Sequence, residues 1–502
     1  MGTACAFIIE NCYNMGDVIG SKESAAFSGW CGTGSEIRNC FNTGFISGAD
    51  DDGLKNLWRN DGTKTENIFT FVEANQGRVL EEEALTSGEL AFLLNGMVSG
   101  GENWYQTLGE DDYPLPFSEG HAKVYATGEL RCDGTPSGDV AFSNEENGEV
   151  IQRDHEFDEE SGICHVCGTY GISTAQQLLS FSFDVQNGEA QKASVILLSD
   201  IDLADVDFEP IGYYEGQDDS SGNLDLSIPY CGVFDGQGHR IYNMVIDQPD
   251  RANLGLFGVV GGGAVIKNVT IDKSCFVNGS RYSAGLVGGI SKSGDVKILN
   301  CGNEADVTVA NQNAGGVLGV NFGNRGALEM VNCYNTGNIT GNNESAGLSG
   351  WLGNATIANC YNSGVIVGVD GDKTLARFAS LSATNCYDMG GQSGTTAFSD
   401  NMLASGELCY LLSGSENNLE SVWRQNIGED EHPVLDPDHK VVIFKGGKFT
   451  NDISGIEIVE DKAPVAVPEG IFTLRGERIN ELRQGINIVR MSDGSVRKVL
   501  IK

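Results

Sequence analysis

Short segments in which apolar and polar side chains alternate recur along most of the chain. In residues 265–271, Val-Ile-Lys-Asn-Val-Thr-Ile, the alternation has a period of two and the β-branched residues suit a pleated surface. Each strand is too short to be stable alone. Gly and Asn between the strands supply tight or left-handed turns. The pattern therefore predicts a mainly β protein in which many short strands support one another.

The strands belong to a repeat that is clearest between residues 250 and 390. A Gly-x-x-Gly block recurs at 255–258, 285–288, 316–319 and 347–350, and an Asn-Cys pair alternates with it. The cysteines that mark the period are Cys275, Cys301, Cys333, Cys360 and Cys386, which follow one another at intervals of 26 to 32 residues. A unit of this length forms one coil of a parallel solenoid, with like strands about 4.8 Å apart. A β-propeller blade needs about 40 residues or more, so the solenoid is favoured.

A second, longer period repeats a whole array. Residues 11–48 match 332–368, and the match resumes where 87–94 correspond to 405–412. We therefore expect the chain to begin inside a repeat array. Four regions are predicted: the C-terminal part of a first β-solenoid array (1–125), a linker module with Cys and His (126–170), a second, complete array (171–445) and a small C-terminal β module (446–502).

These repeats resemble the bacterial GLUG family, named for its Gly-Leu-any-Gly core, over roughly 250–390 and 11–50. The resemblance implies a right-handed parallel β-helix and a protein that is exported or displayed on a bacterial surface, and the family offers no shared catalytic residues to carry over. Residues 26–29, Ala-Phe-Ser-Gly, depart from the core motif, and residues 50–85 contain no clear unit.

Short helices are expected at the ends of the arrays. Ser173 and Thr174 precede the apolar run that starts at Leu178, which predicts a capped helix over the open end of the solenoid. The matching segments 87–94 and 405–412 each predict one helix at the other end of the array, and the two helices are expected to be equivalent.

The strongest signal for chemistry is a Cys-x-x-Cys turn in the linker module. Cys164 and Cys167 present two thiolates to one ion, and Cys132 and His155 supply the two further ligands that tetrahedral zinc needs. The segment is too small and polar to fold on apolar burial alone, so a structural zinc ion would stabilise it. A Cys164–Cys167 disulfide or inert thiols are the alternatives.

The cysteines of the repeats have a simpler interpretation. Cys301, Cys333, Cys360 and Cys386 are expected to stack as a structural ladder of buried free thiols, and repeated Asn at one position can form a hydrogen-bonded ladder. The equivalent Trp30 and Trp351 are expected to pack, although an exposed aromatic ring would suit a glycan. Acidic clusters at 50–52, 218–219 and 370–372 are expected to be solvated loop charge rather than calcium sites.

Composition adds two constraints. The chain has 70 acidic and 32 basic residues, a net charge of −38, which disfavours nucleic acid as a partner. No run of about 18 apolar residues indicates a transmembrane segment, and residues 1–10 lack the features of a signal peptide. A missing upstream part could carry the export signal.

The basic C-terminal region departs from this acidic composition. Residues 470–474, 485–491 and 496–502 alternate as strands of a small module, which we expect to be sandwich-like. Residues 452–502 resemble the C-terminal sorting domains of Bacteroidetes proteins exported by type IX secretion, which implies recognition by outer-membrane secretion machinery. A plain structural β module is the alternative.

These observations favour a secreted or outer-membrane-anchored protein that binds without catalysis, an adhesin toward glycans or host or matrix proteins. A polysaccharide lyase or hydrolase on the same scaffold is the first alternative, and a structural spacer is the second. Convergent carboxylates with a basic residue in a groove would favour the enzyme.

Overall fold

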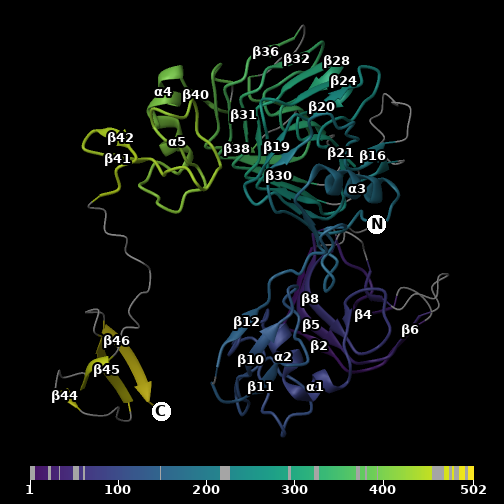
Figure 1. The fold of residues 1–502 in the computed structure, drawn as a ribbon. Coiled ribbons are helices and arrows are strands. Elements are labelled where there is room, and N and C mark those ends of the chain that lie inside the picture. Colours follow the sequence, from purple (N-terminus) through teal and green to yellow (C-terminus); the bar gives the residue numbers. More distant parts are fainter. Residues whose placement is uncertain are drawn as a thin grey trace. The chain divides into compact units, whose positions relative to one another are not determined.

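The computed structural model describes residues 6–20, 24–32, 34–48, 56–59, 63–146, 148–214, 227–291, 295–321, 327–368, 374–378, 382–392, 394–454, 468–473, 478–479, 485–491 and 496–501. The chain forms two compact units, Met1–Val442 and Ile443–Lys502. The first unit is mainly β and consists of parallel β-solenoid of the right-handed type, with few helices, which confirms the predicted fold class (Figure 1).

The second array, residues 170–397, forms the larger solenoid. It has four parallel sheets, and most of its coils contribute one short strand to each sheet. Sheet one contains β13 (Tyr170–Ile172), β14 (Val195–Leu197), β18 (Val233–Asp235), β22 (Val265–Lys267), β26 (Val296–Leu299), β30 (Leu328–Val331), β34 (Ala355–Ala358) and β38 (Ser382–Thr384). Sheet two contains β15 (Ile201–Asp202), β19 (Arg240–Tyr242), β23 (Thr270–Ile271), β27 (Gly302–Asn303), β31 (Tyr334–Asn335), β35 (Tyr361–Asn362), β39 (Tyr387–Asp388) and β40 (Thr396–Ala397).

The other two sheets complete each coil. Sheet three contains β20 (Val245–Asp247), β24 (Phe276–Ser283), β28 (Asp306–Ala314), β32 (Ile339–Gly341) and β36 (Ile366–Val367). Sheet four contains β21 (Phe257–Val260), β25 (Val287–Ile290), β29 (Leu318–Asn321), β33 (Ser349–Leu352) and β37 (Ala376–Phe378). A hairpin of β16 (Tyr213–Tyr214) and β17 (Ser227–Ile228) lies beside this stack. Inside the coils, side chains in register form fully buried rows, such as Phe234, Ile266, Ile298, Met330 and Ile357.

The Gly-x-x-Gly motif has a separate physical cause at each glycine. Gly316 packs against the side chain of Asn335, and a Cβ atom there would lie 2.1 Å from the Asn335 amide oxygen. Gly319 packs against backbone, with Gly288 O at 2.4 Å from an equivalent Cβ. Val317, between them, is fully buried in the core. The motif therefore allows the sheet-four strand to pack closely on both of its sides.

An outer ladder of asparagines marks the corner between sheets one and two. Its members take the left-handed conformation, with φ near +55°, which asparagine tolerates better than most residues. The first amide, Asn268, donates to Asp235, and each later amide donates to the Asn on the preceding coil, for example Asn332 to Asn300 at 2.8 Å and Asn385 to Asn359 at 2.9 Å. The ladder consists of Asn268, Asn300, Asn332, Asn359 and Asn385.

An inner ladder of asparagines runs through sheet two and is completely buried. Asn303 donates to Asn335 at 2.8 Å, and Asn335 donates to Asn362 at the same distance. Each of these amides also donates to a backbone carbonyl two residues further along its own coil. The inner ladder thus satisfies polar groups that the turns would otherwise leave buried and unpaired.

The first array follows the same plan within residues 6–80. Its strands are β1 (Ile8–Glu10), β2 (Tyr13–Asn14), β3 (Val18–Gly20), β4 (Ala25–Ser28), β5 (Glu36–Asn42), β6 (Ile46–Gly48), β7 (Asn56–Trp58), β8 (Lys64–Thr70) and β9 (Arg78–Val79). Because β8 pairs in parallel with β5, the region without a recognisable unit in the sequence contains a further coil. Asn14 donates to Asn42 and Asn67 to Asn39, so both ladders recur here.

Each array carries a module of two short helices at its C-terminal side: the predicted helix and a further short helix that precedes it. The first module contains α1 (Glu83–Ser87) and α2 (Glu89–Leu94), and the second contains α4 (Asp400–Ser405) and α5 (Glu407–Leu412). The glycine between the helices, Gly88 or Gly406, has φ of 95° or 85° and lets the chain reverse.

The segment after each helix pair packs a buried tryptophan on the aromatic rings of the coils. Trp423 lies 5.5 Å from Tyr361 and 6.1 Å from Tyr334 between ring centroids, and those two tyrosines stack at 5.4 Å. Trp104 lies 5.5 Å from Phe41 in the same arrangement. The longer sequence period therefore reflects a duplicated structural module.

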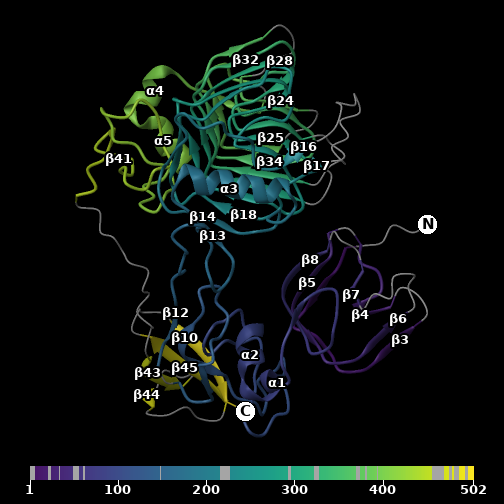
Figure 2. The same ribbon diagram turned by 45° about the vertical axis from the view of Figure 1, so that its right-hand side comes forward.

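Helix α3 (Ala175–Gln186) closes the start of the larger solenoid, beside β14 and β18 (Figure 2). Its N-cap is Thr174, whose hydroxyl accepts from the backbone N–H of Gln177 at 3.2 Å. Leu178 and Phe181 are buried in the solenoid core. The predicted capping helix is thus confirmed. No helix among the described residues is long and apolar enough to span a membrane.

The second unit, described by itself, is an antiparallel β structure. It begins with the hairpin of β41 (Ile443–Lys445) and β42 (Lys448–Thr450). β43 (Pro468–Thr473), β44 (Arg478–Ile479), β45 (Gly485–Met491) and β46 (Val496–Ile501) form one sheet in the order β44-β43-β45-β46. A second layer of the expected sandwich is not found among its described residues.

We predict that Asn335→Ala lowers the stability of the chain markedly. The change removes the acceptor for Asn303 and the donor to Asn362 and Gly337, and leaves these groups buried and unpaired. The expected loss is about 3 kcal/mol, measured as a lower urea midpoint by circular dichroism. Asn338→Ala, at an exposed position three residues away, is the control and should shift stability by less than about 0.5 kcal/mol. Equal midpoints for the two variants would contradict the role of the inner ladder.

Candidate metal centre

Three separate segments bring together the four residues singled out in the linker module. Cys132 lies in a turn after β10 (Tyr125–Leu130), and His155 follows β12 (Val150–Gln152), which pairs in parallel with β10. β11 (Ala141–Ser143) pairs with the other edge of β10. Cys164 and Cys167 occupy a tight turn that ends at Gly168, whose φ is 74°. In that turn, Gly168 N donates to Cys164 O and Cys164 N donates to Thr169 O.

The four donor atoms lie close enough together to bind one metal ion. The sulfur and nitrogen atoms all lie within 4.8 Å of one another. The Sγ atoms of Cys132 and Cys164 are 3.6 Å apart, and Cys167 Sγ is 3.3 Å from His155 Nδ1. A disulfide needs about 2.05 Å between sulfurs, whereas ligands of a tetrahedral ion with Zn–S bonds of about 2.3 Å lie about 3.8 Å apart. The cysteines among the described residues are free thiols.

The electrostatic environment shifts the pKa values of the two closest thiols, Cys132 and Cys164, in opposite directions. Burial raises the pKa of Cys132 to about 12, and the neighbouring thiols add to this shift. Burial also opposes ionisation of Cys164, but the backbone N–H groups of Cys167 and Val166 and the His155 side chain outweigh it and lower the Cys164 pKa to about 6. The turn therefore stabilises a thiolate, the form that binds metal.

Packing holds the imidazole and the turn in place. The ring of His155 stacks on Phe157 with 5.2 Å between centroids. Phe157 lies on Gly171, where a Cβ atom would be 2.7 Å from the ring, so only glycine fits there. Ile163 bridges to Tyr170 in β13, the first strand of the larger solenoid. The cluster is thus continuous with the start of that solenoid and can hold a structural metal ion.

The cysteines of the repeats lie elsewhere and are inert. Cys301, Cys333, Cys360 and Cys386 occupy equivalent positions on successive coils, and all are buried. Burial raises the pKa of Cys301 to about 12.

Cys275 does not belong to this row, although its spacing suggested that it does. The strand register places Val269 at the position equivalent to Cys301. Cys275 lies at the next corner, where the following coil has Ala305. Coil lengths vary, so a spacing of 26 residues did not establish the register.

Structure reveals one charged cluster that sequence reasoning missed. On sheet two, Arg240 pairs with Asp272 at 2.9 Å and with Glu304, and Tyr334 donates to Glu304 at 2.8 Å. His432, from the segment after α5, lies 4.0 Å from Glu304. The signal was available: Arg240, Asp272 and Glu304 follow one another at 32 residues, which is a repeat length.

The two equivalent tryptophans differ in their surroundings. Trp30 is 60 % exposed, so the expectation that it packs is wrong. Trp351 is half-buried beneath the guanidinium of Arg377, 5.6 Å from the ring centroid. His239 pairs with Asp200 at 3.1 Å, which indicates a structural role. The acidic clusters at 50–52, 218–219 and 370–372 lie outside the described residues.

Comparison with known proteins does not assign the chain to a family or an activity. No family model matches the chain. Halomucin of Haloquadratum walsbyi is 31 % identical over 112 residues, which is 22 % of this chain, and the chain spans about 1 % of the length of that protein. A Bacteroides ovatus protein described as a "putative immunoglobulin A1 protease" is 19 % identical, with a TM-score of 0.39 over 55 % of this chain and 94 % of the other. A similarity of this size does not indicate a shared activity.

Proposed function

We propose that the chain is a non-catalytic binding protein of the cell surface or the secreted fraction, in which the solenoid presents a rigid face to glycans or to host or matrix proteins. Sheet three is the observation that supports this proposal. Its outward side chains lie in register on consecutive coils about 4.8 Å apart. One such row consists of Asp247, Asn278, Thr308, Thr340 and Val367.

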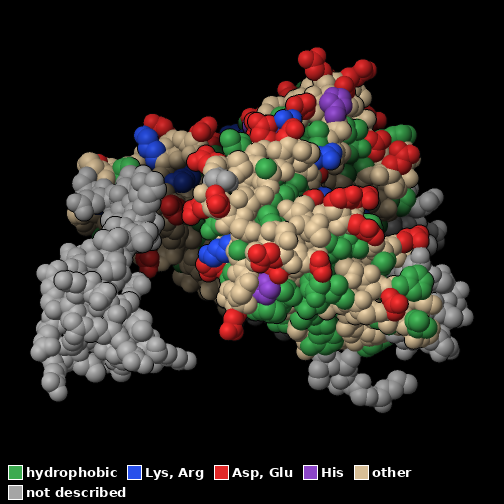
Figure 3. Space-filling view, turned by 90° about the horizontal axis from the view of Figure 1, so that it is seen from below, with side chains coloured by type: hydrophobic (Ala, Val, Ile, Leu, Met, Phe, Trp, Pro, Cys, Tyr) green, Lys and Arg blue, Asp and Glu red, His purple; other side chains and the backbone are tan. Residues whose placement is uncertain are grey.

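This row offers the groups that a glycan or an extended polypeptide can use. Asn278 donates to Asp247 at 2.6 Å, so the row is partly ordered by its own hydrogen bonds. Val367 is 54 % exposed and adds an apolar contact at one end. The chain as a whole has 70 acidic and 32 basic residues, and the face seen from below in Figure 3 carries more Asp and Glu than Lys and Arg side chains, which favours neutral or basic partners over nucleic acid.

The enzyme alternative depends on the carboxylates of Asp272 and Glu304, and their environment does not suit it. Both pair with Arg240, and the side chains of Asp272 and Glu304 are only 12 % and 9 % exposed. Burial opposes ionisation of Asp272, but hydrogen bonds from Ser274 and Arg240 lower its pKa below the usual range. A glycosidase needs one carboxyl group with a raised pKa as general acid, and the lowered pKa of Asp272 does not suit that role.

We expect Thr340→Arg to abolish binding and Thr356→Arg to leave it intact. Both threonines are exposed on strands, Thr340 in sheet three and Thr356 in sheet one, so a long charged side chain disturbs only one face. The full chain and both variants are compared on a printed array of defined oligosaccharides and matrix proteins. The same loss in both variants, or in neither, would argue against sheet three. Absence of any binding would favour a spacer.

We also propose that Cys132, His155, Cys164 and Cys167 bind one structural zinc ion. The donor set of three thiols and one imidazole within 4.8 Å supports zinc over calcium or magnesium, which prefer oxygen. All four positions of a tetrahedral ion are filled by protein, which is typical of a structural rather than a catalytic site. The ion would stabilise a module that has little apolar core of its own.

Purified chain should contain about one zinc ion per molecule, and Cys164→Ser should lose it. Cys231→Ser is the matched control, because Cys231 is a half-buried free thiol outside the cluster. Elemental analysis gives the zinc content, and limited proteolysis reports the order of residues 126–170, which should be cleaved faster without zinc. Zinc retained by Cys164→Ser would contradict the assignment.

Zinc binding should release protons, because the ligands must be deprotonated. At pH 7 the Cys132 thiol, with a pKa near 12, is protonated in the metal-free chain and must give up its proton. Below about pH 6 the Cys164 thiol is protonated as well, so zinc affinity should fall more steeply there. Calorimetry in buffers of different ionisation enthalpy measures the released protons. A binding heat independent of the buffer would contradict this picture.

The C-terminal unit is proposed to direct export. Its antiparallel strands β43, β45 and β46 coincide with the segments that resemble sorting domains, and Ile443–Lys502 forms a compact unit of its own. A compact, separate unit suits recognition by outer-membrane secretion machinery. The GLUG-like repeats support the same location, since that resemblance implies exported or surface proteins.

A further inference from the structure

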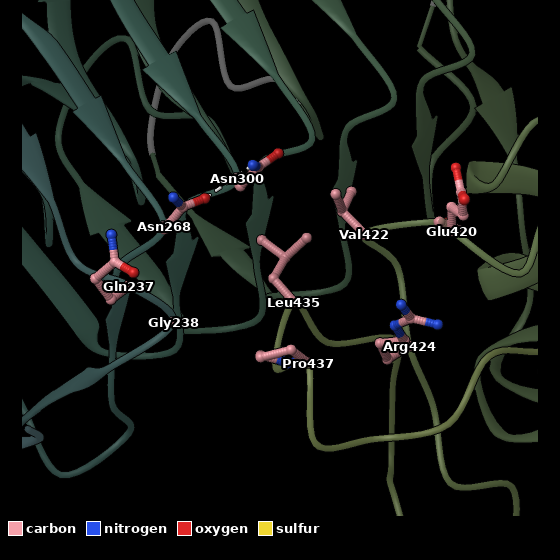
Figure 4. A pocket seen from close by; sticks show the side chains of 10 residues that line it. Gln237, Gly238, Asn268, Asn300, Glu420, Val422, Arg424, Leu435 and Pro437 are labelled. Atoms are coloured by element: carbon pink, nitrogen blue, oxygen red, sulfur yellow. Dashed lines mark hydrogen bonds between the residues drawn. The ribbon is translucent and has the colours of Figure 1, made fainter. Parts of the chain in front are cut away.

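A pocket of about 270 Å³ lies between the outer asparagine ladder and the segment that follows α5 (Figure 4). Its ladder side is formed by Gln237, Gly238, Asn268 and Asn300. Its other side is formed by Glu420, Ser421, Val422, Arg424, Leu435 and Pro437. Pro437 packs on Gly238, where a Cβ atom would be 3.3 Å away, and this contact holds the two sides together.

The ladder side presents a row of carboxamides with unused hydrogen-bonding capacity. Asn268 donates one N–H to Asp235 and accepts from Asn300, while Asn300 accepts from Asn332. A carboxamide has two N–H donors and two acceptor positions, so each ladder amide retains one donor and one acceptor. The exposed Gln237 side chain lies next to them, and Figure 4 shows the three amides in a row.

The spacing between neighbouring amides of this row matches a spacing found in sugars. Neighbouring amides on successive coils repeat at about 4.8 Å, which is close to the separation of hydroxyl groups on alternate carbons of a pyranose ring. The apolar side chains of Leu435 and Val422 face the same hollow and can cover the C–H face of a sugar (Figure 4). Arg424 and Glu420 lie further along the pocket and can contact substituents of an adjoining residue.

The duplicated module shows that one of the pocket-lining side chains, Arg424, is not needed to build the fold. Tyr105 in the first module is equivalent to Arg424, since Tyr105 bridges to Leu115 as Arg424 bridges to Val434. The structural tryptophans Trp104 and Trp423 precede them in both modules. Thus the buried frame is the same in the two modules, whereas a residue that lines the pocket differs.

We propose that this pocket binds one pyranose residue of a saccharide, with Gln237, Asn268 and Asn300 on its hydroxyl groups and Leu435 and Val422 on its apolar face. The volume is slightly below the range of about 300 to 1,000 Å³ found for drug-sized ligands, which fits a single sugar ring. The site is separate from the sheet-three face, so either can fail without the other.

Saturation-transfer NMR on the full chain tests the proposal with glucose, galactose, mannose, N-acetylglucosamine and glucuronate at millimolar concentration. Gln237→Gly removes one amide and relieves the positive φ of 52°, so it should bind at least about tenfold more weakly without loss of stability. Val422→Phe, which fills the hollow, should have the same effect. Ser415→Gly, at another position with positive φ of 60°, is the control and should bind like the parent.

The expected result is saturation transfer to at least one sugar, lost in both pocket variants and kept in Ser415→Gly. Two results would overturn the proposal: no transfer to any of the five sugars, or equal transfer in the parent and both pocket variants. Thermal melting of every variant separates lost binding from lost folding.

Discussion

The in-register stacking of side-chain amides is the constraint on which the rest of the structure depends. Most of the parallel strands are too short to set their own register, and a shift of one residue would move every core side chain to the surface. The ladder through Asn303, Asn335 and Asn362 ties each coil to the next inside the core. The Gly-x-x-Gly strands then pack against that ladder because their first glycine leaves room for it.

Once the register is set, side chains that are far apart in sequence lie next to one another on consecutive coils. Arg240, Asp272 and Glu304 come from three consecutive coils and form one charged cluster. The aromatic rings of Tyr334 and Tyr361 stack and receive Trp423 from the module after α5. The same principle arranges the exposed row on sheet three, so the interior order determines the geometry of any surface that binds a partner.

Much of the fold could be predicted because its determinants are local and repeated. The period of the Asn-Cys pairs and of the Gly-x-x-Gly blocks indicated a parallel solenoid, and Thr174 marked the start of α3. The strand register could not be predicted reliably from the sequence, because coil lengths vary from 26 to 32 residues. Cys275 therefore has the spacing of the cysteine row that contains Cys301 without belonging to it. The charged cluster and the exposure of Trp30 depend on which residues lie side by side or are covered by a later segment, and neither is encoded in local pattern.

The candidate metal centre, like the fold, could be predicted only in part from the sequence. Cys164 and Cys167 stood out because a single turn contains both, and the structure brings Cys132 and His155 to within 4.8 Å of them. The carbonyl and amide contacts that shape the turn, and the stacking of His155 on Phe157, were invisible in the sequence. The pocket beside the outer ladder was likewise not predictable, because segments more than a hundred residues apart form its two sides.

The central claim is that the solenoid binds its ligand and leaves it intact. Mass spectrometry of an oligosaccharide recovered after prolonged incubation with the full chain tests this most directly. The account predicts that the recovered mass is unchanged. A product that has gained water, or an unsaturated product of elimination, would contradict it.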